Sequence, residues 1–204
     1  GTPPRYAVID TGTNSIKFHV GERAGDGTWR AVVDRAEVTR LGEGLEQSGE
    51  ISDEAVARAA DAIAGMVAEA KTHGALAITA VGTAGLRIAG NRDAVIEAIA
   101  ARTGVRIEVV SGEEESRLAY LAVKAGVGLA EGSLAVFDTG GGSTQLTFGR
   151  GDRVDERFSV DVGAVRYTEQ FGLGGVVTPE VMREAMAAIA ADLVRLDGRT
   201  PVDA

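Results

Sequence analysis

Apolar and polar residues follow each other along this chain in an order that repeats once. Short apolar runs bounded by turn residues predict strands, and apolar residues spaced three or four positions apart predict helices. The predicted strands cover residues 6–10, 16–20, 29–38, 76–81, 107–110, 134–137, 144–148 and 153–160. The predicted helices cover residues 52–71, 91–103, 113–123 and 178–196, with Ser52 and Thr178 as N-caps. Each half of the chain therefore begins with three strands, and helices follow.

The turn that follows the first strand of each half has nearly the same sequence in both. Residues 7–15, Ala-Val-Ile-Asp-Thr-Gly-Thr-Asn-Ser, return 128 positions later as residues 135–143, Ala-Val-Phe-Asp-Thr-Gly-Gly-Gly-Ser, with six of the nine positions identical. Successive backbone N–H groups in such a turn form an anion-binding concavity, and a strand-end Asp suits a metal ion that also binds phosphate. A tight hairpin whose Asp accepts backbone hydrogen bonds is the purely structural alternative, and the repetition favours the functional interpretation.

These turns predict two phosphate sites with carboxylates beside them. The expected phosphate-binding residues are Gly12, Thr13, Asn14 and Ser15 in the first copy, and Gly140, Gly141, Gly142, Ser143 and Thr144 in the second. The expected metal-binding carboxylates are Asp10 and Asp138. The pattern is neither a P-loop nor a dinucleotide fingerprint, because no Gly-Lys-Ser/Thr is present and each turn leads into a strand.

Charged residues between the two copies supply further candidates. Glu113, Glu114 and Glu115 open a predicted helix, where acids also simply complement the helix dipole. A carboxylate near bound phosphate can deprotonate an attacking water. Two arginines, Arg87 and Arg117, are candidates for phosphate contact, with a surface salt bridge as the alternative. We expect Arg87 to lie in a flexible loop at the end of a strand.

Composition narrows the classes of function and of partner. The 204 residues carry a net charge of −9, which argues against a general nucleic-acid surface. No apolar run approaches the roughly 20 residues of a membrane-spanning helix. The absence of cysteine fits a reducing cytoplasm.

The repeat also predicts two domains. We expect one domain over residues 1–125 and a second over 126–204, with a hinge near residues 126–132. The second half stops after its first long helix, so we expect the natural chain to continue past Ala204.

The chain resembles the exopolyphosphatase/guanosine pentaphosphate phosphatase family, within the superfamily of actin-like ATPases, sugar kinases and Hsp70. The matching motifs occur in order at residues 8–15, 40–45, 81–87 with Asn91, 110–118, 137–144 and 162–169. The Ser-Gly-Glu-Glu-Glu-x-Arg-Leu segment at 111–118 is the most specific of them. The resemblance implies an α/β fold of ribonuclease-H-like domains with mixed five-stranded sheets, an active-site cleft between them, and a second domain that is incomplete here.

The same resemblance implies a chemistry. It implies Mg²⁺-dependent hydrolysis of a terminal phosphoanhydride of inorganic polyphosphate or of guanosine pentaphosphate. From the net charge we expect no DNA partner. Glu115 becomes the expected general base, Arg87 a phosphate contact and Asp138 a metal ligand. Gln145 stands where the family usually has Glu, so this metal position keeps an acceptor oxygen and loses a charge. Many relatives are dimers, which makes a homodimer an expectation.

Two other functions stay open from the sequence. A kinase of the same superfamily needs an adenine-binding segment in its second domain, which this chain lacks. A non-catalytic sensor of polyphosphate or of guanosine penta- and tetraphosphate is supported by Gln145 alone.

Overall fold

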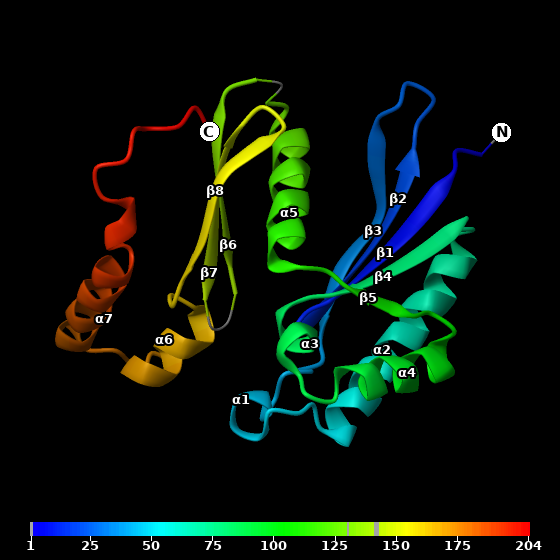
Figure 1. The fold of residues 1–204 in the computed structure, drawn as a ribbon, viewed down its shortest axis with the longest axis horizontal. Coiled ribbons are helices and arrows are strands. Elements are labelled where there is room, and N and C mark those ends of the chain that lie inside the picture. The colour runs from blue at the N-terminus through cyan, green and yellow to red at the C-terminus, as the bar shows by residue number, and fades with distance from the viewer. Residues whose placement is uncertain (1, 130, 141–142) are drawn as a thin grey trace. The chain divides into compact units, whose positions relative to one another are not determined.

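The computed structural model describes residues 2–129, 131–140 and 143–204 and separates them into two compact units. The first unit is Gly1–Gly112 and the second is Glu113–Ala204. Helix α5 (Gly112–Val127, Figure 1) belongs with the second unit. Its Tyr120 is fully buried in one cluster with Leu134 and Val136. The expected boundary at 125/126 falls within this helix, and the extent of the complete domains stays a prediction.

The first unit contains a five-stranded mixed sheet in the order β3-β2-β1-β4-β5. Its strands are β1 (Arg5–Thr11), β2 (Ser15–Arg23), β3 (Trp29–Val38), β4 (Ala77–Gly82) and β5 (Ile107–Val109). The first three are antiparallel, and β4 and β5 run parallel to β1. Helices α2 (Asp53–Thr72) and α4 (Arg92–Thr103) lie on one face of this sheet (Figure 1). The predicted mixed five-stranded sheet is confirmed.

Side-chain alternation explains which face of the sheet is covered. On β1, Ala7 and Ile9 are buried, and on β2, Ile16, Phe18 and Val20 are fully buried, at every second position. The Ser52 hydroxyl caps α2 by accepting a hydrogen bond from the Ala55 N–H at 3.2 Å, as predicted. Two short helices were not predicted, α1 (Leu45–Ser48) and α3 (Ala84–Ile88).

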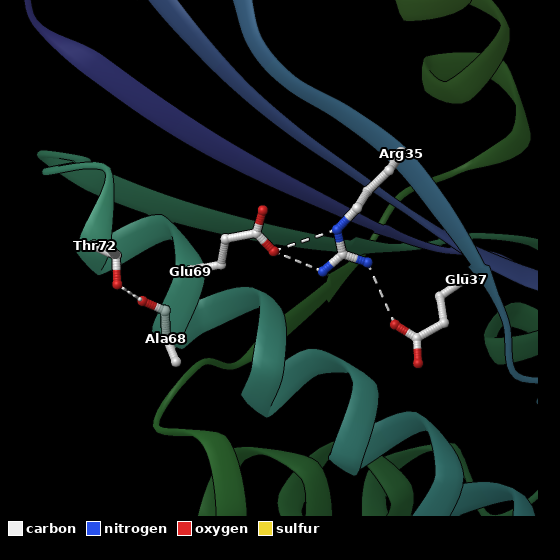
Figure 2. Close-up of polar contacts among 5 residues, drawn as sticks. All are labelled: Arg35, Glu37, Ala68, Glu69 and Thr72. Atoms are coloured by element: carbon white, nitrogen blue, oxygen red, sulfur yellow. Dashed lines mark hydrogen bonds and ion pairs between the residues drawn. The ribbon is translucent and has the colours of Figure 1, made fainter.

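A surface arginine connects the edge strand β3 to helix α2. Arg35 donates from Nε and Nη2 to Glu69 Oε2 at 3.3 and 2.8 Å, and from Nη1 to Glu37 at 3.4 Å (Figure 2). Its guanidinium also lies 5.2 Å from the centre of the Phe18 ring. The aliphatic and cationic parts of Arg35 therefore cover the rim of the core at the point where an edge strand would otherwise expose it.

The second unit contains an antiparallel sheet in the order β6-β7-β8, followed by helices. Its elements after α5 are β6 (Ser133–Thr139), β7 (Thr144–Arg150), β8 (Arg153–Val160), α6 (Ala164–Phe171), α7 (Pro179–Asp192) and the 3₁₀ turn η1 (Val194–Leu196) (Figure 1). Helix α6 was not among the elements read from the apolar pattern. The predicted helix 178–196 ends earlier, because Leu193 and Leu196 turn in to pack on β7 and β8.

The sequence repeat is also a repeat of structure. Thr11 pairs with Ile16 across the first turn, and Thr139 pairs with Thr144 across the second, at the same offset of 128 positions. Each second strand then carries an irregularity at the same place, after Val20 in β2 and after Phe148 in β7. The two turns are therefore built on equivalent hairpins.

None of the helices formed by residues 2–129, 131–140 and 143–204 has both the length and the apolar character of a membrane span.

Glu22 is a buried carboxylate whose removal tests the far end of the first sheet. The residue is 3 % exposed, accepts from Arg5 Nε at 2.9 Å and pairs with Arg30. The hydrogen bonds from Arg5 and then Arg30 hold the pKa of Glu22 below its usual value. A group with a depressed folded pKa stabilises the fold above its unfolded pKa and loses that contribution as pH falls through the folded value.

We therefore expect Glu22→Gln to lower the thermal midpoint at pH 7, because it leaves two arginines without their buried partner. The difference from wild type should shrink as the pH falls through the lowered pKa of Glu22, because the wild-type carboxylate then also becomes protonated. Glu97→Gln is the matched control, since Glu97 pairs with Arg106 on the exposed surface and should change the midpoint little. Equal midpoints for Glu22→Gln and wild type at pH 7 would contradict this role.

Tyr167 connects α6 to α7 and gives a prediction at alkaline pH. Its hydroxyl donates to Asp192 Oδ2 at 2.6 Å, and this hydrogen bond to a carboxylate, with burial, raises the pKa of Tyr167 to about 12. The contact is complete below the unfolded pKa near 10 and is lost as pH rises towards 12. Wild type should lose stability between pH 10 and 12 more steeply than Tyr167→Phe, measured by urea unfolding followed by circular dichroism. Parallel pH curves for the two proteins would show that this contact contributes nothing.

Candidate functional site

The two repeated turns are closed by the same hydrogen bond. The Gly12 N–H donates to the Ser15 carbonyl at 3.1 Å, and the Gly140 N–H donates to the Ser143 carbonyl at 2.9 Å. A Cβ atom at position 12 would lie 2.6 Å from the Ser15 oxygen, so only glycine permits this closure. Each turn thus directly follows a strand that ends in Asp-Thr, in the same geometry.

Closure of the first turn leaves N–H groups available at its tip. Thr13 and Asn14 are exposed, and their backbone N–H groups donate to no acceptor among residues 2–129, 131–140 and 143–204. Two successive N–H groups of this kind form a small anion-binding concavity. In the second turn Gly141 and Gly142, which we expect to bind phosphate, lie outside the described residues.

Two neighbouring segments hold the first turn in place. The Thr13 hydroxyl accepts a hydrogen bond from the Gly85 N–H at 3.0 Å, and the Thr13 carbonyl accepts one from the Gly42 N–H at 2.8 Å. A Cβ at position 42 would lie 2.2 Å from Thr13 Cγ2, so Gly42 permits the close approach. The Thr13 side chain therefore points to α3, and its contribution to phosphate binding is limited to its N–H group and any proton that the hydroxyl donates.

Arg87 lies in helix α3, and the expected flexible loop was wrong at this position. The Arg87 N–H donates to the Thr83 carbonyl at 3.0 Å, and the Ala89 N–H donates to the Gly85 carbonyl at 3.1 Å, which completes one helical turn. The guanidinium is half-buried and donates from Nη1 to the Val110 carbonyl at 2.9 Å. Because Gly85 also bonds Thr13, α3 fixes Arg87 relative to the first turn.

The three acids at the start of α5 differ in their surroundings. Glu113 is exposed, whereas Glu114 accepts two hydrogen bonds from Arg117 at 2.9 and 2.8 Å. This pair lowers the pKa of Glu114 and raises that of Arg117. Arg117, a candidate for phosphate contact, is therefore engaged in a salt bridge within the helix. Glu115 is half-buried and is the acid for which a role as base remains proposed.

The second turn places two metal-type oxygen donors side by side. Asp138 lies directly opposite Gln145 in the β6–β7 ladder, so their side chains share one face of the sheet. Gln145 Oε1 is buried and has no hydrogen-bond partner among the described residues. An exposed carboxylate next to an unsatisfied amide oxygen suits Mg²⁺, which takes few protein ligands together with phosphate oxygens and water.

The equivalent position in the first copy holds a different residue. Lys17 lies opposite Asp10 in the β1–β2 ladder, where Gln145 lies opposite Asp138 in the second. The lysine at this position offers a metal ion no oxygen, so the second copy, with Asp138 and Gln145 in register, offers the better donor set. Within residues 2–129, 131–140 and 143–204 no cluster of three or more His, Cys, Asp and Glu suitable for a metal occurs.

The remaining predicted residues and one groove complete the description. The Thr144 hydroxyl is buried and donates to the Val162 carbonyl at 2.6 Å, so it connects β7 to the segment before α6. A groove lined by Glu113, Arg117 and residues 152–157 contains none of the predicted catalytic or metal-binding residues. The sequence analysis did not predict the hydrogen bonds from residues 39–42 to the first turn. Gly42 was a signal for them, because glycine permits close approach of two backbone segments.

The structure thus assembles the predicted residues in two groups. The first unit holds Asp10, the turn 12–15 and Arg87, joined through the Thr13–Gly85 hydrogen bond. The second unit holds Glu115, Asp138, the turn 140–143 and Gln145, with Asp138 and Gln145 in register.

Comparison with known proteins agrees with these motifs. Residues 22–200 match the model of the Ppx/GppA phosphatase family. A protein of Mycobacterium leprae called exopolyphosphatase 1 is 30 % identical over 82 % of this chain and 49 % of its own length. A protein of Aliivibrio fischeri called guanosine-5'-triphosphate,3'-diphosphate pyrophosphatase is 32 % identical over 91 % of this chain and 37 % of its own length.

Solved structures show the same fold. The crystal structure of the Aquifex aeolicus Ppx/GppA phosphatase superimposes with a TM-score of 0.80 at 28 % identity, over 98 % of this chain and 65 % of the other. This chain spans about half the length of the M. leprae relative, and less of the A. fischeri one. The fold is that of the actin-like ATPases, as expected from the sequence. The family model covers most of the chain, which therefore belongs to the Ppx/GppA phosphatase family.

Proposed function

We propose that this protein is a Mg²⁺-dependent hydrolase that releases the terminal phosphate of inorganic polyphosphate or of guanosine pentaphosphate. One observation carries the proposal. Two equivalent hairpin turns, closed by the same glycine hydrogen bond at 3.1 and 2.9 Å, each follow a strand whose last two residues are Asp-Thr. The names of the relatives, exopolyphosphatase and guanosine-5'-triphosphate,3'-diphosphate pyrophosphatase, support a phosphoanhydride substrate.

Phosphate binding is assigned to backbone N–H groups and to Arg87. The free N–H groups of Thr13 and Asn14 suit the oxygens of a phosphate, and the proposal extends the same role to Ser15, Ser143, Thr144, Gly141 and Gly142. The N–H groups of Gly12 and Gly140 close the two turns, so these glycines serve the site by shaping the turns. Arg87 donates from a helix that Thr13 holds in place. Phosphoryl transfer depends mainly on positioning and charge stabilisation, which these groups supply.

Glu115 is assigned the role of general base. Its carboxylate accepts a proton from the attacking water, the water oxygen bonds to the terminal phosphorus, and the bond from phosphorus to the bridging oxygen breaks. The products are inorganic phosphate and a chain shorter by one phosphate. In the second unit, Asp138 and Gln145 are the residues that would hold Mg²⁺, which would neutralise phosphate charge. In the first unit, Asp10 is the carboxylate proposed as a metal ligand.

A sensor without catalysis is the second candidate, favoured by the neutral amide of Gln145 beside Asp138. Measurement of phosphate released from polyphosphate and from guanosine pentaphosphate with Mg²⁺ separates the two functions. Binding without release would favour the sensor, and transfer of phosphate from ATP to an acceptor would favour a kinase. We also expect a cytoplasmic protein and a homodimer, which size-exclusion chromatography with light scattering would test.

Replacement of Glu115 tests the base directly. Glu115→Gln should lower the rate of phosphate release roughly 10²–10⁴-fold, because the amide cannot accept the proton from water. Glu113→Gln, the same change two residues earlier on an exposed side chain, should release phosphate at the wild-type rate. Equal rates for Glu115→Gln and wild type would remove Glu115 from the mechanism.

Restoring a carboxylate at position 145 tests the metal assignment. A new charge close to the ion is worth on the order of 1–4 kcal/mol, so Gln145→Glu should lower the Mg²⁺ concentration for half-maximal activity roughly tenfold or more. Gln170→Glu makes the same change on the exposed surface of α6 and should leave that concentration unchanged. An identical Mg²⁺ requirement for Gln145→Glu and wild type would place the ion elsewhere.

A further inference from the structure

Arg40 has a backbone conformation that its side chain disfavours. Its backbone φ is 50°, and no other non-glycine residue among those described has a positive φ. A left-handed conformation at a residue with a Cβ costs about 1–3 kcal/mol and persists only where the surroundings impose it. Such backbone outliers cluster at active sites and ligand-binding sites. The presence of an arginine at this position therefore needs an explanation.

Four hydrogen bonds impose the conformation. The N–H groups of Thr39 and Arg40 both donate to the Asn14 carbonyl, at 3.1 and 2.9 Å. From α2, Arg58 donates to the Thr39 carbonyl at 2.9 Å and to the Arg40 carbonyl at 3.3 Å. The backbone at position 40 is thus held between the first turn and α2, and its place beside Asn14 is fixed.

The side chain of Arg40 has no structural task that accounts for this cost. It is exposed, and no hydrogen bond or ion pair joins its guanidinium to any of residues 2–129, 131–140 and 143–204. Arg58, its neighbour, contrasts with it, because that guanidinium pairs with Glu43 at 2.8 Å.

Arg40 is adjacent to the free N–H groups of the first turn. The Arg40 N–H donates to the carbonyl of Asn14. The N–H of Asn14 is one of the two unpaired donors at the tip of that turn. A guanidinium that starts from this point has an anion-binding concavity next to it, and it can donate two parallel hydrogen bonds to a phosphate.

We propose that Arg40 is a further substrate-binding residue, which completes an anion site with the N–H groups of Thr13 and Asn14 and binds a phosphate of the phosphoanhydride chain. The inference builds on the proposed function and adds a residue to it. It also explains why arginine occupies a position where glycine would avoid the strain.

Replacement by glycine separates binding from structure, because the two roles predict opposite results. Arg40→Gly relieves the left-handed strain, so the thermal midpoint of the 204-residue chain should stay the same or rise. Tripolyphosphate binding in the presence of Mg²⁺, measured by isothermal titration calorimetry, should weaken roughly tenfold or more. Arg40→Lys, which keeps the charge and loses the paired donors, should bind with intermediate affinity.

Arg23→Gln and Arg40→Gln form a matched pair of charge removals. Arg23 is exposed at the other end of β2 from the first turn, so its loss should leave tripolyphosphate affinity at the wild-type value. Equal weakening by both variants would show a general charge effect and overturn the inference. Undiminished binding by Arg40→Gly would overturn it and leave the proposed function intact, whereas a wild-type chain that neither binds tripolyphosphate nor releases phosphate would remove both.

Discussion

The hydrogen bond from the Gly12 N–H to the Ser15 carbonyl, at 3.1 Å, is the constraint on which the first phosphate site depends. It draws β1 and β2 together within four residues and turns the N–H groups of Thr13 and Asn14 to the surface. The carbonyls of the same two residues accept hydrogen bonds from residues 39, 40 and 42. One tight turn therefore leaves backbone donors for an anion while its carbonyls hold the turn in place.

The chain uses this turn twice, and the two copies have diverged at the residue opposite the Asp. The first copy places an ammonium group, Lys17, across from Asp10, and the second places the amide of Gln145 across from Asp138. The hairpin backbone is insensitive to this difference, because its register depends on the turn and on the buried alternate positions. The chemistry of the two hairpins does differ, since the amide of Gln145 offers a metal ion an oxygen and the side chain of Lys17 offers none. Equivalent backbones thus support different roles.

Much of the fold followed from local pattern. The bounds of β3 (Trp29–Val38) and β8 (Arg153–Val160) are those that the apolar runs predicted, and the Ser52 and Thr178 caps lie where expected. The short helices α1 and α3 were missed because four or five residues are too few to show a helical period. Arg87 was consequently placed in a loop, although the residue type and its proximity to the turn were foreseen.

The sequence by itself determined the repeated Asp-Thr-Gly hairpins and the order of strands and helices, because these depend on residue identity and on periodicity along the chain. Its motifs also identified the family, and the resemblance to that family implied the mixed five-stranded sheet. Only the tertiary structure decided how the candidate groups are used. It paired Arg117 with Glu114, directed the Thr13 hydroxyl to Gly85, and held Arg40 in a left-handed conformation beside Asn14. Hydrogen bonds between residues 18 to 72 positions apart produced the last two arrangements, and no local pattern records which partners the folded chain brings together.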